Sequence, residues 1–346
     1  MYKLVVTPLA GNLSQIPTKF PNLIGTFNPT LSEHGLSLLI SVLKTNDEKL
    51  NLRNIQKAKS VSGILLDVSG LNKTILHNYP IRKRSWKEID KIVLSHTHYD
   101  HVGALDEVLE KIWEEEGYKR NVPVYVHPYG CCERFYKFDS SLDLEKFIGK
   151  PRSALLPYEE QLRIERLPDF KPKHTGSLVF ERESVLLFEN DHVAIRTTGE
   201  IKLPKHLQGL KKNIISLKSN NGILEEDKIL DDQSIIVSMK KKKQSVLVLG
   251  CCHAGLIPTI LQSERLTNLP IHSIIGGMHL IDTVGEELKK VCKELIQRKG
   301  LKYLYPMHCT GSNFFHEIKS ECEKRKMEYP KCFNDLPALS NIVFDL

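Results

Sequence analysis

Short apolar runs alternate with amphipathic segments along most of the chain. In the first half, four apolar runs predict buried strands, at Leu36–Leu43, Val61–Val68, Lys91–Ser95 and Val122–Val126. The segment Val102–Glu116 places its apolar residues on one helical face, and Gly117 supplies a stop. This half therefore predicts a mixture of buried strands and at least one surface helix.

The second half repeats the pattern. The predicted strands are Ser234–Met239, Ser245–Gly250, Ile271–Ile275 and Lys302–Tyr305, and the predicted helices are Ile257–Leu266 and Glu286–Lys299. Lys240–Lys243 separates the first two strands and is expected at an exposed hairpin tip. Two halves that each mix strands and helices predict an α/β fold with two sheets packed face to face and helices outside.

Two stretches, at about 130–175 and 201–230, fit this pattern poorly. Long irregular segments within a compact domain are often lids or binding loops, and the alternative is surface decoration. We expect one domain over residues 1–346 with insertions or lids at these two places.

The cysteines and the start of the chain bear on location. No apolar run is long enough to span a bilayer, and the first residues lack the pattern of a signal peptide. The eight cysteines include the adjacent pairs Cys131–Cys132 and Cys251–Cys252, which favours reduced thiols over a disulfide framework. We therefore expect a cytoplasmic protein without a membrane partner.

The formal net charge of +7 suits a small phosphate-bearing substrate. However, much of the excess lies in short runs that we interpret as solvated loops, namely Arg82–Arg84, residues 211–212 and Lys240–Lys243. A nucleic-acid surface would need a continuous basic stripe with stacking aromatic residues, and the sequence has no such pattern. Nucleic acid is therefore not an expected partner.

The strongest chemical signal is the run Ser95-His96-Thr97-His98-Tyr99-Asp100-His101, between a predicted strand and a predicted helix. In extended backbone, His96 and His98 point to the same side, and Asp100 and His101 can approach from the start of the helix. Three imidazoles and a carboxylate suit a divalent ion such as zinc. The alternative, a polar loop of solvated histidines, is less compatible with this spacing.

Further histidines follow three later predicted strands. They lie in Cys251-Cys252-His253, in Gly276-Gly277-Met278-His279 and in Pro306-Met307-His308. Loops at strand ends gather beside a sheet, where ligands commonly collect. Any one of these histidines could instead be a hydrogen-bonded core residue.

The His96-x-His98-x-Asp100-His101 run resembles the signature of the metallo-β-lactamase superfamily. Asp67 ends an earlier strand, as in that superfamily, although Val68-Ser69 stands where the family usually has Thr-Gly. The resemblance implies an αββα sandwich with two divalent ions, zinc or alternatively manganese or iron, between the loops of the two sheets.

Other segments resemble one branch of the superfamily, which is named after 7,8-dihydropterin-6-methyl-4-(β-D-ribofuranosyl)-aminobenzene-5′-phosphate synthase. Besides the three histidine loops, they are Glu33-His34-Gly35-Leu36-Ser37, Thr198-Gly199-Glu200-Ile201 and Asp231-Asp232-Gln233. The similarity extends from about residue 33 to residue 311.

The branch implies a set of site residues. The expected metal ligands are His96, His98, Asp100, His101, His253 and His308. Glu200 and Cys251 stand where the hydrolases keep a His and a bridging Asp, so they are further candidate ligands. We expect His34 and His279 to face the substrate or to support the ligands, and Asp67 to orient a ligand histidine through its second ring nitrogen.

Two reactions are compatible with such a site, with Asp100 and His101 as its catalytic residues. As a synthase-like transferase, it would release pyrophosphate from a pterin-methyl diphosphate, and His34, Arg196 and Lys202 are possible phosphate contacts. As a hydrolase, it would cleave a phosphodiester or a lactone. The third hypothesis is a metal-binding protein without turnover.

Overall fold

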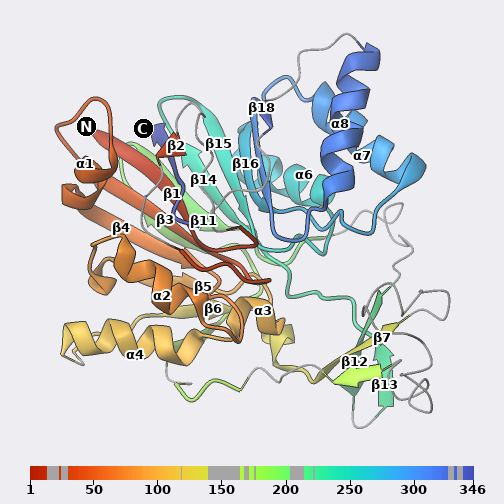
Figure 1. The fold of residues 1–346 in the computed structure, drawn as a ribbon, viewed down its shortest axis with the longest axis horizontal. Helices are drawn as coiled ribbons and strands as arrows, with labels where there is room; N and C mark the ends of the chain where they lie inside the picture. Colours follow the sequence, from red (N-terminus) through yellow and green to blue (C-terminus); the bar gives the residue numbers. More distant parts are fainter. Residues whose placement is uncertain are drawn as a thin grey trace.

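The computed structural model describes residues 1–13, 23–24, 30–117, 119–138, 164–166, 171–174, 177–202, 214–220, 223–325, 331–332 and 338–346. Two large β-sheets pack face to face, with helices on both outer sides (Figure 1). The strands of the eight-stranded sheet are, in spatial order, β2 (Leu23–Ile24), β19 (Asn341–Asp345), β1 (Tyr2–Ala10), β3 (Ser37–Lys44), β4 (Lys59–Leu66), β5 (Lys91–Val93), β6 (Val124–Val126) and β9 (Leu178–Phe180).

The second large sheet comes from the later part of the chain. Its seven strands are, in spatial order, β10 (Leu186–Glu189), β11 (Val193–Thr197), β14 (Ile235–Met239), β15 (Gln244–Leu249), β16 (Ile271–Gly277), β17 (Tyr303–Met307) and β18 (Lys331–Cys332). The described helices are α1 (Leu52–Lys57), α2 (Thr74–Ile81), α3 (Tyr99–Val102), α4 (Leu105–Glu116), α6 (Leu256–Thr267), α7 (Gly285–Gln297) and α8 (Ser312–Arg325), with short 3-10 turns at Trp86–Glu88 and Pro128–Cys131.

The alternation of side chains along each strand builds the layers. In β3, Leu38 and Ile40 join the apolar core between the two sheets, whereas Leu39 joins a second core beneath α2 and α4. A third core lies between the other face of the seven-stranded sheet and α6, α7 and α8. Both sheets are thus covered on both faces, which explains the nearly continuous apolar runs in the sequence. The predicted αββα sandwich is confirmed.

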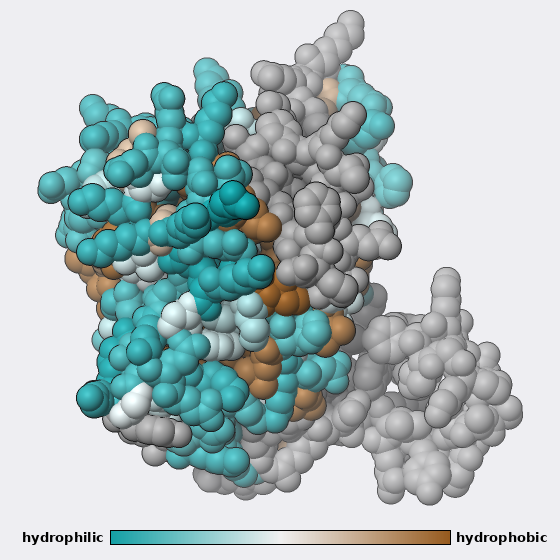
Figure 2. Space-filling model, turned by 60° about the vertical axis from the view of Figure 1, so that its left-hand side comes forward, coloured by the Kyte–Doolittle hydropathy of each residue, from teal (hydrophilic) through white to brown (hydrophobic). Residues whose placement is uncertain are grey.

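The structure corrects two details. The expected helix Val102–Glu116 is divided at Gly103 and Ala104 into α3 and α4. The run Arg82–Arg84 is not a solvated loop, because Arg82 and Arg84 are buried in ion pairs with Glu88. Lys240–Lys243 is an exposed turn between β14 and β15, as predicted. Much of the face drawn in Figure 2 is likewise hydrophilic.

A separate four-stranded sheet occupies parts of the two expected insertions. It consists of β13 (Ile223–Glu226), β12 (Ile214–Asn220), β7 (Arg134–Phe138) and β8 (Ile164–Arg166), and it lies apart from the two large sheets (Figure 1). Residues 139–163, 167–170, 175–176, 203–213 and 221–222 lie outside the described residues. The single domain and the lid role stay predictions. Among the helices that the structure describes, none is long and apolar enough to cross a membrane.

The loops that carry the candidate site residues follow two sets of parallel strands. β4, β5 and β6 run parallel in one sheet, and β15, β16 and β17 run parallel in the other. Ligand sites in such sheets collect beyond the carboxyl ends of the strands. The two sets of ends meet here, because Gly250 after β15 lies so close to Ser95 after β5 that a Cβ on Gly250 would come within 2.1 Å of the Ser95 hydroxyl oxygen. Only glycine permits this approach.

Candidate metal centre

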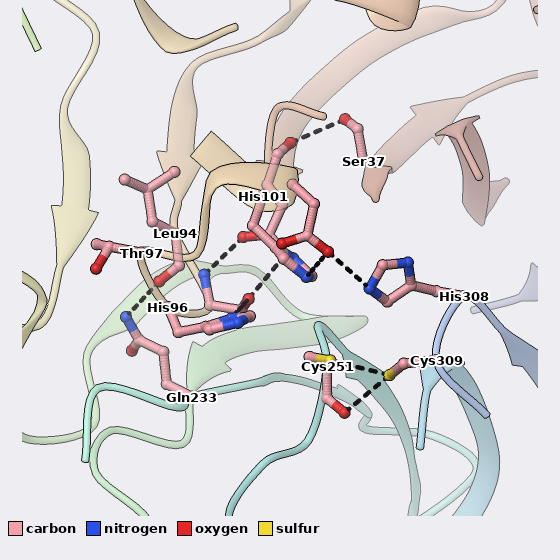
Figure 3. Close-up of polar contacts among 12 residues, drawn as sticks. Ser37, Leu94, His96, Thr97, His101, Gln233, Cys251, His308 and Cys309 are labelled. Carbon is pink, nitrogen blue, oxygen red and sulfur yellow. Dashed lines mark hydrogen bonds and ion pairs between the residues drawn. The ribbon is translucent and has the colours of Figure 1, made fainter. Parts of the chain in front are cut away.

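The histidine run follows β5 directly. His96 and His98 leave the strand in extended backbone, and His98 then caps α3, whose single turn carries Asp100 and His101. Loops from the other sheet supply His253 after β15, His279 after β16 and His308 after β17. The structure therefore brings the histidine run and three later loops together at one edge of the sandwich, and Figure 3 shows His96, His101 and His308 from this set.

One group of donors consists of His96, His98 and His253. Their donor atoms lie within 4.8 Å of one another, and the Nε2 atoms of His253 and His96 are 3.1 Å apart. The rings meet edge to face, at 4.4 Å between the centroids of His96 and His98 and at 4.8 Å between those of His98 and His253. Three ring nitrogens thus converge on one small volume.

A second group surrounds the Asp100 carboxylate. Its Oδ2 atom lies 3.3 Å from His308 Nε2, 3.5 Å from His101 Nε2 and 3.7 Å from His34 Nε2. The His34 ring stacks on the His308 ring at 4.8 Å. The His34 side chain is 60% exposed, whereas that of Asp100 is 8% exposed and those of His101 and His308 are fully buried. His34 is therefore the member of this group that solvent reaches.

Asp67 orients two of the histidines. Its Oδ2 atom accepts a hydrogen bond from His101 Nδ1 at 2.7 Å and another from the Ser95 hydroxyl at 2.7 Å. Since that hydroxyl has one proton and donates it to Asp67, Ser95 Oγ accepts from His96 Nδ1 at 3.0 Å. His96 then presents an unprotonated Nε2 to the cluster, as metal-ligating histidines do.

The charges of the cluster favour a cation. Burial lowers the pKa of His98 to about 4 and, with the neighbouring His101 and His98, lowers the pKa of His96 well below its ordinary value. Burial raises the pKa of Asp100, but His101 and His308 outweigh it and hold that pKa well below its usual range. Burial lowers the pKa of His101, yet Asp100 and Asp67 together raise it to about 9.

These donors fit a divalent metal ion. His96 and His98 are neutral and Asp100 is ionised at neutral pH, which are the protonation states that ligands need. His101 Nε2 is buried, makes no hydrogen bond and faces the Asp100 carboxylate. A positive charge is therefore favoured at this position, and a metal ion could supply it in place of the His101 proton. A set of imidazoles with one carboxylate matches borderline divalent ions.

Comparisons with known proteins agree with this geometry. Residues 68–201 match the family model of the metallo-β-lactamase superfamily. A Methanocaldococcus jannaschii protein named 7,8-dihydropterin-6-methyl-4-(beta-D-ribofuranosyl)-aminobenzene-5′-phosphate synthase is 28% identical over 306 residues, which cover 87% of this chain and 90% of that protein. An uncharacterised protein of the same organism is 22% identical over 81% of this chain and 85% of its own length. The crystal structure of Tm1679, described as a metal-dependent hydrolase of the beta-lactamase superfamily, superposes with a TM-score of 0.63 at 18% identity, over 99% of each chain.

These comparisons support the metallo-β-lactamase superfamily for this chain. Within it, the chain is similar to the synthase-like branch, as the sequence motifs predicted. Members of the superfamily generally bind divalent metal ions.

Some expected site residues lie elsewhere. The Glu200 carboxylate pairs with His127 Nε2 at 3.3 Å and with Arg182 Nε at 3.6 Å, outside the histidine groups. Arg196 donates to the backbone carbonyl of Leu266, and Lys202 pairs with Glu183 at the surface. Glu200 was expected as a ligand from its position in the sequence pattern, but it is not part of the described donor groups.

Cys251 and His279 lie beside the histidines. Cys251 Sγ is within 4.8 Å of donor atoms of His96 and His101, and His279 Nδ1 is 3.4 Å from Cys251 Sγ. The ring of His279 also packs against that of His253 at 4.1 Å. Cys251 thus forms a possible donor group with His96 and His101, whereas His279 borders the histidines through Cys251 and His253.

Sequence reasoning missed the residues that hold the histidine run. Arg134, at the start of β7, binds Asp227 at 2.7 Å, Asp231 at 2.5 Å and the Thr97 hydroxyl at 2.5 Å. Asp231 also accepts the Thr97 backbone N–H at 3.0 Å, so the residue between His96 and His98 is held from two sides. Asp231 was visible only as part of a family motif, and nothing in the sequence pointed to Arg134.

Proposed function

We propose that the protein is a metal-dependent transferase that binds two divalent ions at the histidine cluster and releases pyrophosphate from a pterin-methyl diphosphate. The observation that carries the proposal is the similarity to the named synthase over 87% of the chain, together with two adjacent donor groups. In this proposal, zinc is the resident metal, and manganese or iron are the alternatives.

The two donor groups divide the ligands. His96, His98 and His253 would hold one ion. Asp100, with His101 and His308 beside its carboxylate, would hold the other. When bound, the ions would supply Lewis acidity that stabilises the negative charge developing on a pyrophosphate leaving group. Glu200 is left out of the ligand set because its carboxylate is engaged by His127 and Arg182.

The chain's own residues orient and protect these groups. Asp67 holds His101 directly and His96 through Ser95, and Arg134 holds the intervening loop through Thr97. His34 is the exposed member of the cluster, so it is the residue that contacts the incoming substrate. In the transfer, the aminobenzene nitrogen of the second substrate bonds to the pterin methylene carbon, the C–O bond to the diphosphate breaks, and pyrophosphate leaves with the electron pair. The nitrogen then loses a proton.

A hydrolase is the second candidate, because the described function of Tm1679 is metal-dependent hydrolysis and its fold is shared over 99% of the chain. The same donor groups would then serve the cleavage of a phosphodiester or a lactone. A metal-binding protein without turnover is the third.

One experiment separates the three. Metal-loaded protein is assayed for pyrophosphate release from a pterin-methyl diphosphate with an aminobenzene acceptor, and in parallel with a phosphodiester and a lactone. We expect pyrophosphate release that needs both the acceptor and the metal. Faster turnover of the phosphodiester or the lactone would overturn the transferase in favour of the hydrolase, and no turnover of any substrate by fully loaded protein would favour the third candidate.

The matched variants are His34→Ala and His77→Ala. His77 is an exposed histidine on α2 and belongs to none of the described donor groups. We expect His34→Ala to raise KM for the diphosphate while the metal content is retained, and His77→Ala to behave as the wild type. An unchanged KM in His34→Ala would remove His34 from the substrate site.

A further inference from the structure

A cluster of sulfur and nitrogen donors lies next to the histidines. Cys251, His279 and Cys309 come from the three successive loops after β15, β16 and β17, and their donor atoms lie within 4.8 Å of one another. Figure 3 shows the side chains of Cys251 and Cys309 facing each other. Cys251 and Cys309 are each 4% exposed, so the sulfurs are shielded from solvent.

The two sulfurs are unusually close. Cys251 Sγ and Cys309 Sγ are 2.9 Å apart, and Cys309 Sγ also lies 3.3 Å from the backbone oxygen of Cys251. Non-bonded carbon atoms are most favourable at about 3.5–4.0 Å, and sulfur is the larger atom. A thiol is only a weak hydrogen-bond donor, so a thiol–thiol hydrogen bond is a poor reason for so short a contact.

The backbone around the cluster is shaped to aim these donors. His279 has φ 47° and Cys252, next to Cys251, has φ 65°, and both values lie in the left-handed region that side chains other than glycine rarely adopt. Gly277 has no side chain where a Cβ would stand 2.9 Å from Cys309 Sγ. Such backbone conformations persist where the surrounding structure imposes them, often at ligand sites.

We propose that Cys251, His279 and Cys309 form a further site, directly beside the histidine groups, for one soft divalent ion of the zinc type. Two sulfurs and one imidazole nitrogen are the donors that such ions prefer. Sulfurs bound to a tetrahedral ion at about 2.3 Å stand about 3.8 Å apart, so binding would relieve the close contact.

Charges and protons balance when the ion binds at this site. Each thiol releases its proton to solvent on binding, and the two thiolates neutralise the two charges of the ion, so a neutral unit is buried. No oxidant is needed, whereas a disulfide between the same two sulfurs would require one. The site would tie the His279 loop to the loop that carries His253, since these rings pack at 4.1 Å.

The test uses the full chain, reduced, freed of metal and then loaded with Co²⁺. Thiolate ligands give cobalt a charge-transfer absorption in the near ultraviolet that histidine and carboxylate ligands do not. We expect this band in the wild type, and we expect Cys309→Ser to lose one equivalent of cobalt and most of the band. Both readouts are independent of turnover, so they can fail or succeed separately from the proposed reaction.

Cys252→Ser is the matched control. Cys252 is in the same loop, is 1% exposed, and contacts Thr259 Oγ1 at 3.5 Å instead of the cluster. We expect Cys252→Ser to keep both the band and the metal content. We also expect His96→Ala to keep the band while it loses metal from the histidine groups.

Three results would overturn the proposal. The first is a wild type without the band. The second is a Cys309→Ser protein with unchanged band and stoichiometry, because Cys251 alone would then serve the histidine cluster. The third is a disulfide between Cys251 and Cys309. Denatured protein that has not been reduced would then show six reactive thiols instead of the eight in the sequence, and the two missing thiols would be missing only when both cysteines are present. If Cys309→Ser does not fold, His279→Gln replaces it, and unchanged cobalt affinity in that variant would equally overturn the site.

Discussion

Two buried polar clusters lie at opposite ends of β5, and they are built on different principles. Before the strand, Glu88 accepts from Arg82 Nη1 at 2.5 Å, from Arg84 and from the Tyr79 hydroxyl at 2.9 Å. After the strand, the rings of His96 and His253 direct ring nitrogens at each other at 3.1 Å, and Asp100 has three imidazoles around it.

The difference lies in what completes each cluster. The Glu88 cluster contains its own opposite charges, and Arg84 also donates to the backbone carbonyls of Ile55 and Ala58, so nothing further is required. The histidine cluster instead gathers imidazole nitrogens around one carboxylate, that of Asp100. A buried ion pair carries its own opposite charges, whereas several imidazole nitrogens gathered with a carboxylate are the donors that suit a divalent cation. From this contrast we expect the Glu88 cluster to be structural and the histidine cluster to be functional.

The largest effect is expected when a donor is removed from the histidine cluster, which tests whether this cluster binds metal. His96→Ala should reduce metal content and turnover to background, because His96 contributes to the group with His98 and His253. The protein should stay folded, since no opposite charge is left unpaired. Elemental analysis, an activity assay and circular dichroism would check this. Full activity in the variant would refute the assignment of the metal site.

Glu88→Gln should lower the stability of the fold and leave the metal content unchanged, in contrast to His96→Ala. It leaves Arg82 and Arg84, whose side chains are 6% and 7% exposed, without their carboxylate. Breaking a buried pair from one side typically costs about 3–5 kcal/mol of unfolding free energy. Chemical denaturation would measure the loss, and metal content should be unchanged. A loss below about 1 kcal/mol would mean that the ion pairs do not hold this end of the sheet.

Asp67→Asn tests a residue that orients the histidines of the cluster. The amide would weaken the hold on His101 and, through Ser95, on His96. The expected loss of metal affinity is about 10–100-fold, as for other groups that orient metal ligands. Ser95→Ala disturbs only the His96 arm and should have a smaller effect. Competition with a chelator would measure both, and equal affinities in wild type and Asp67→Asn would contradict the role of Asp67.

The smallest expected effect is a pH dependence of the Glu88 cluster. Burial raises the pKa of Glu88, but Arg82 and Arg84 outweigh it and lower that pKa below 4.5 in the folded protein. The ion pairs therefore stabilise the fold fully above pH 4.5, and this contribution is lost as the pH falls through the lower folded value. The stability difference between wild type and Glu88→Gln should be constant near neutrality and shrink below pH 4.5. A difference that grew on acidification would contradict the sign.

Much of the fold could be predicted because local pattern and tertiary burial agree. The apolar runs that became β3, β4, β14, β15 and β16 are buried on both faces, so their composition alone marks them as core strands. β1 and β19 were not predicted. They pair with each other from the two ends of the chain, and such pairing depends on contacts that local sequence does not encode.

From the sequence alone, the apolar runs predicted two sheets packed face to face, and the resemblance to the metallo-β-lactamase signature implied the αββα sandwich. The spacing of His96, His98, Asp100 and His101 marked these residues as one chemical unit, because short-range spacing is a local property of the chain. Tertiary structure alone decided which distant residues join that unit. The meeting of two sets of parallel strand ends placed His253, His308 and the Cys251–Cys309 pair at the site, and it left Glu200 with His127. It also buried Arg82 and Arg84, whose run in the sequence resembles a solvated loop, because Glu88 folds back onto them. A short motif specifies its own chemistry, but only the packing of the sheets selects its partners.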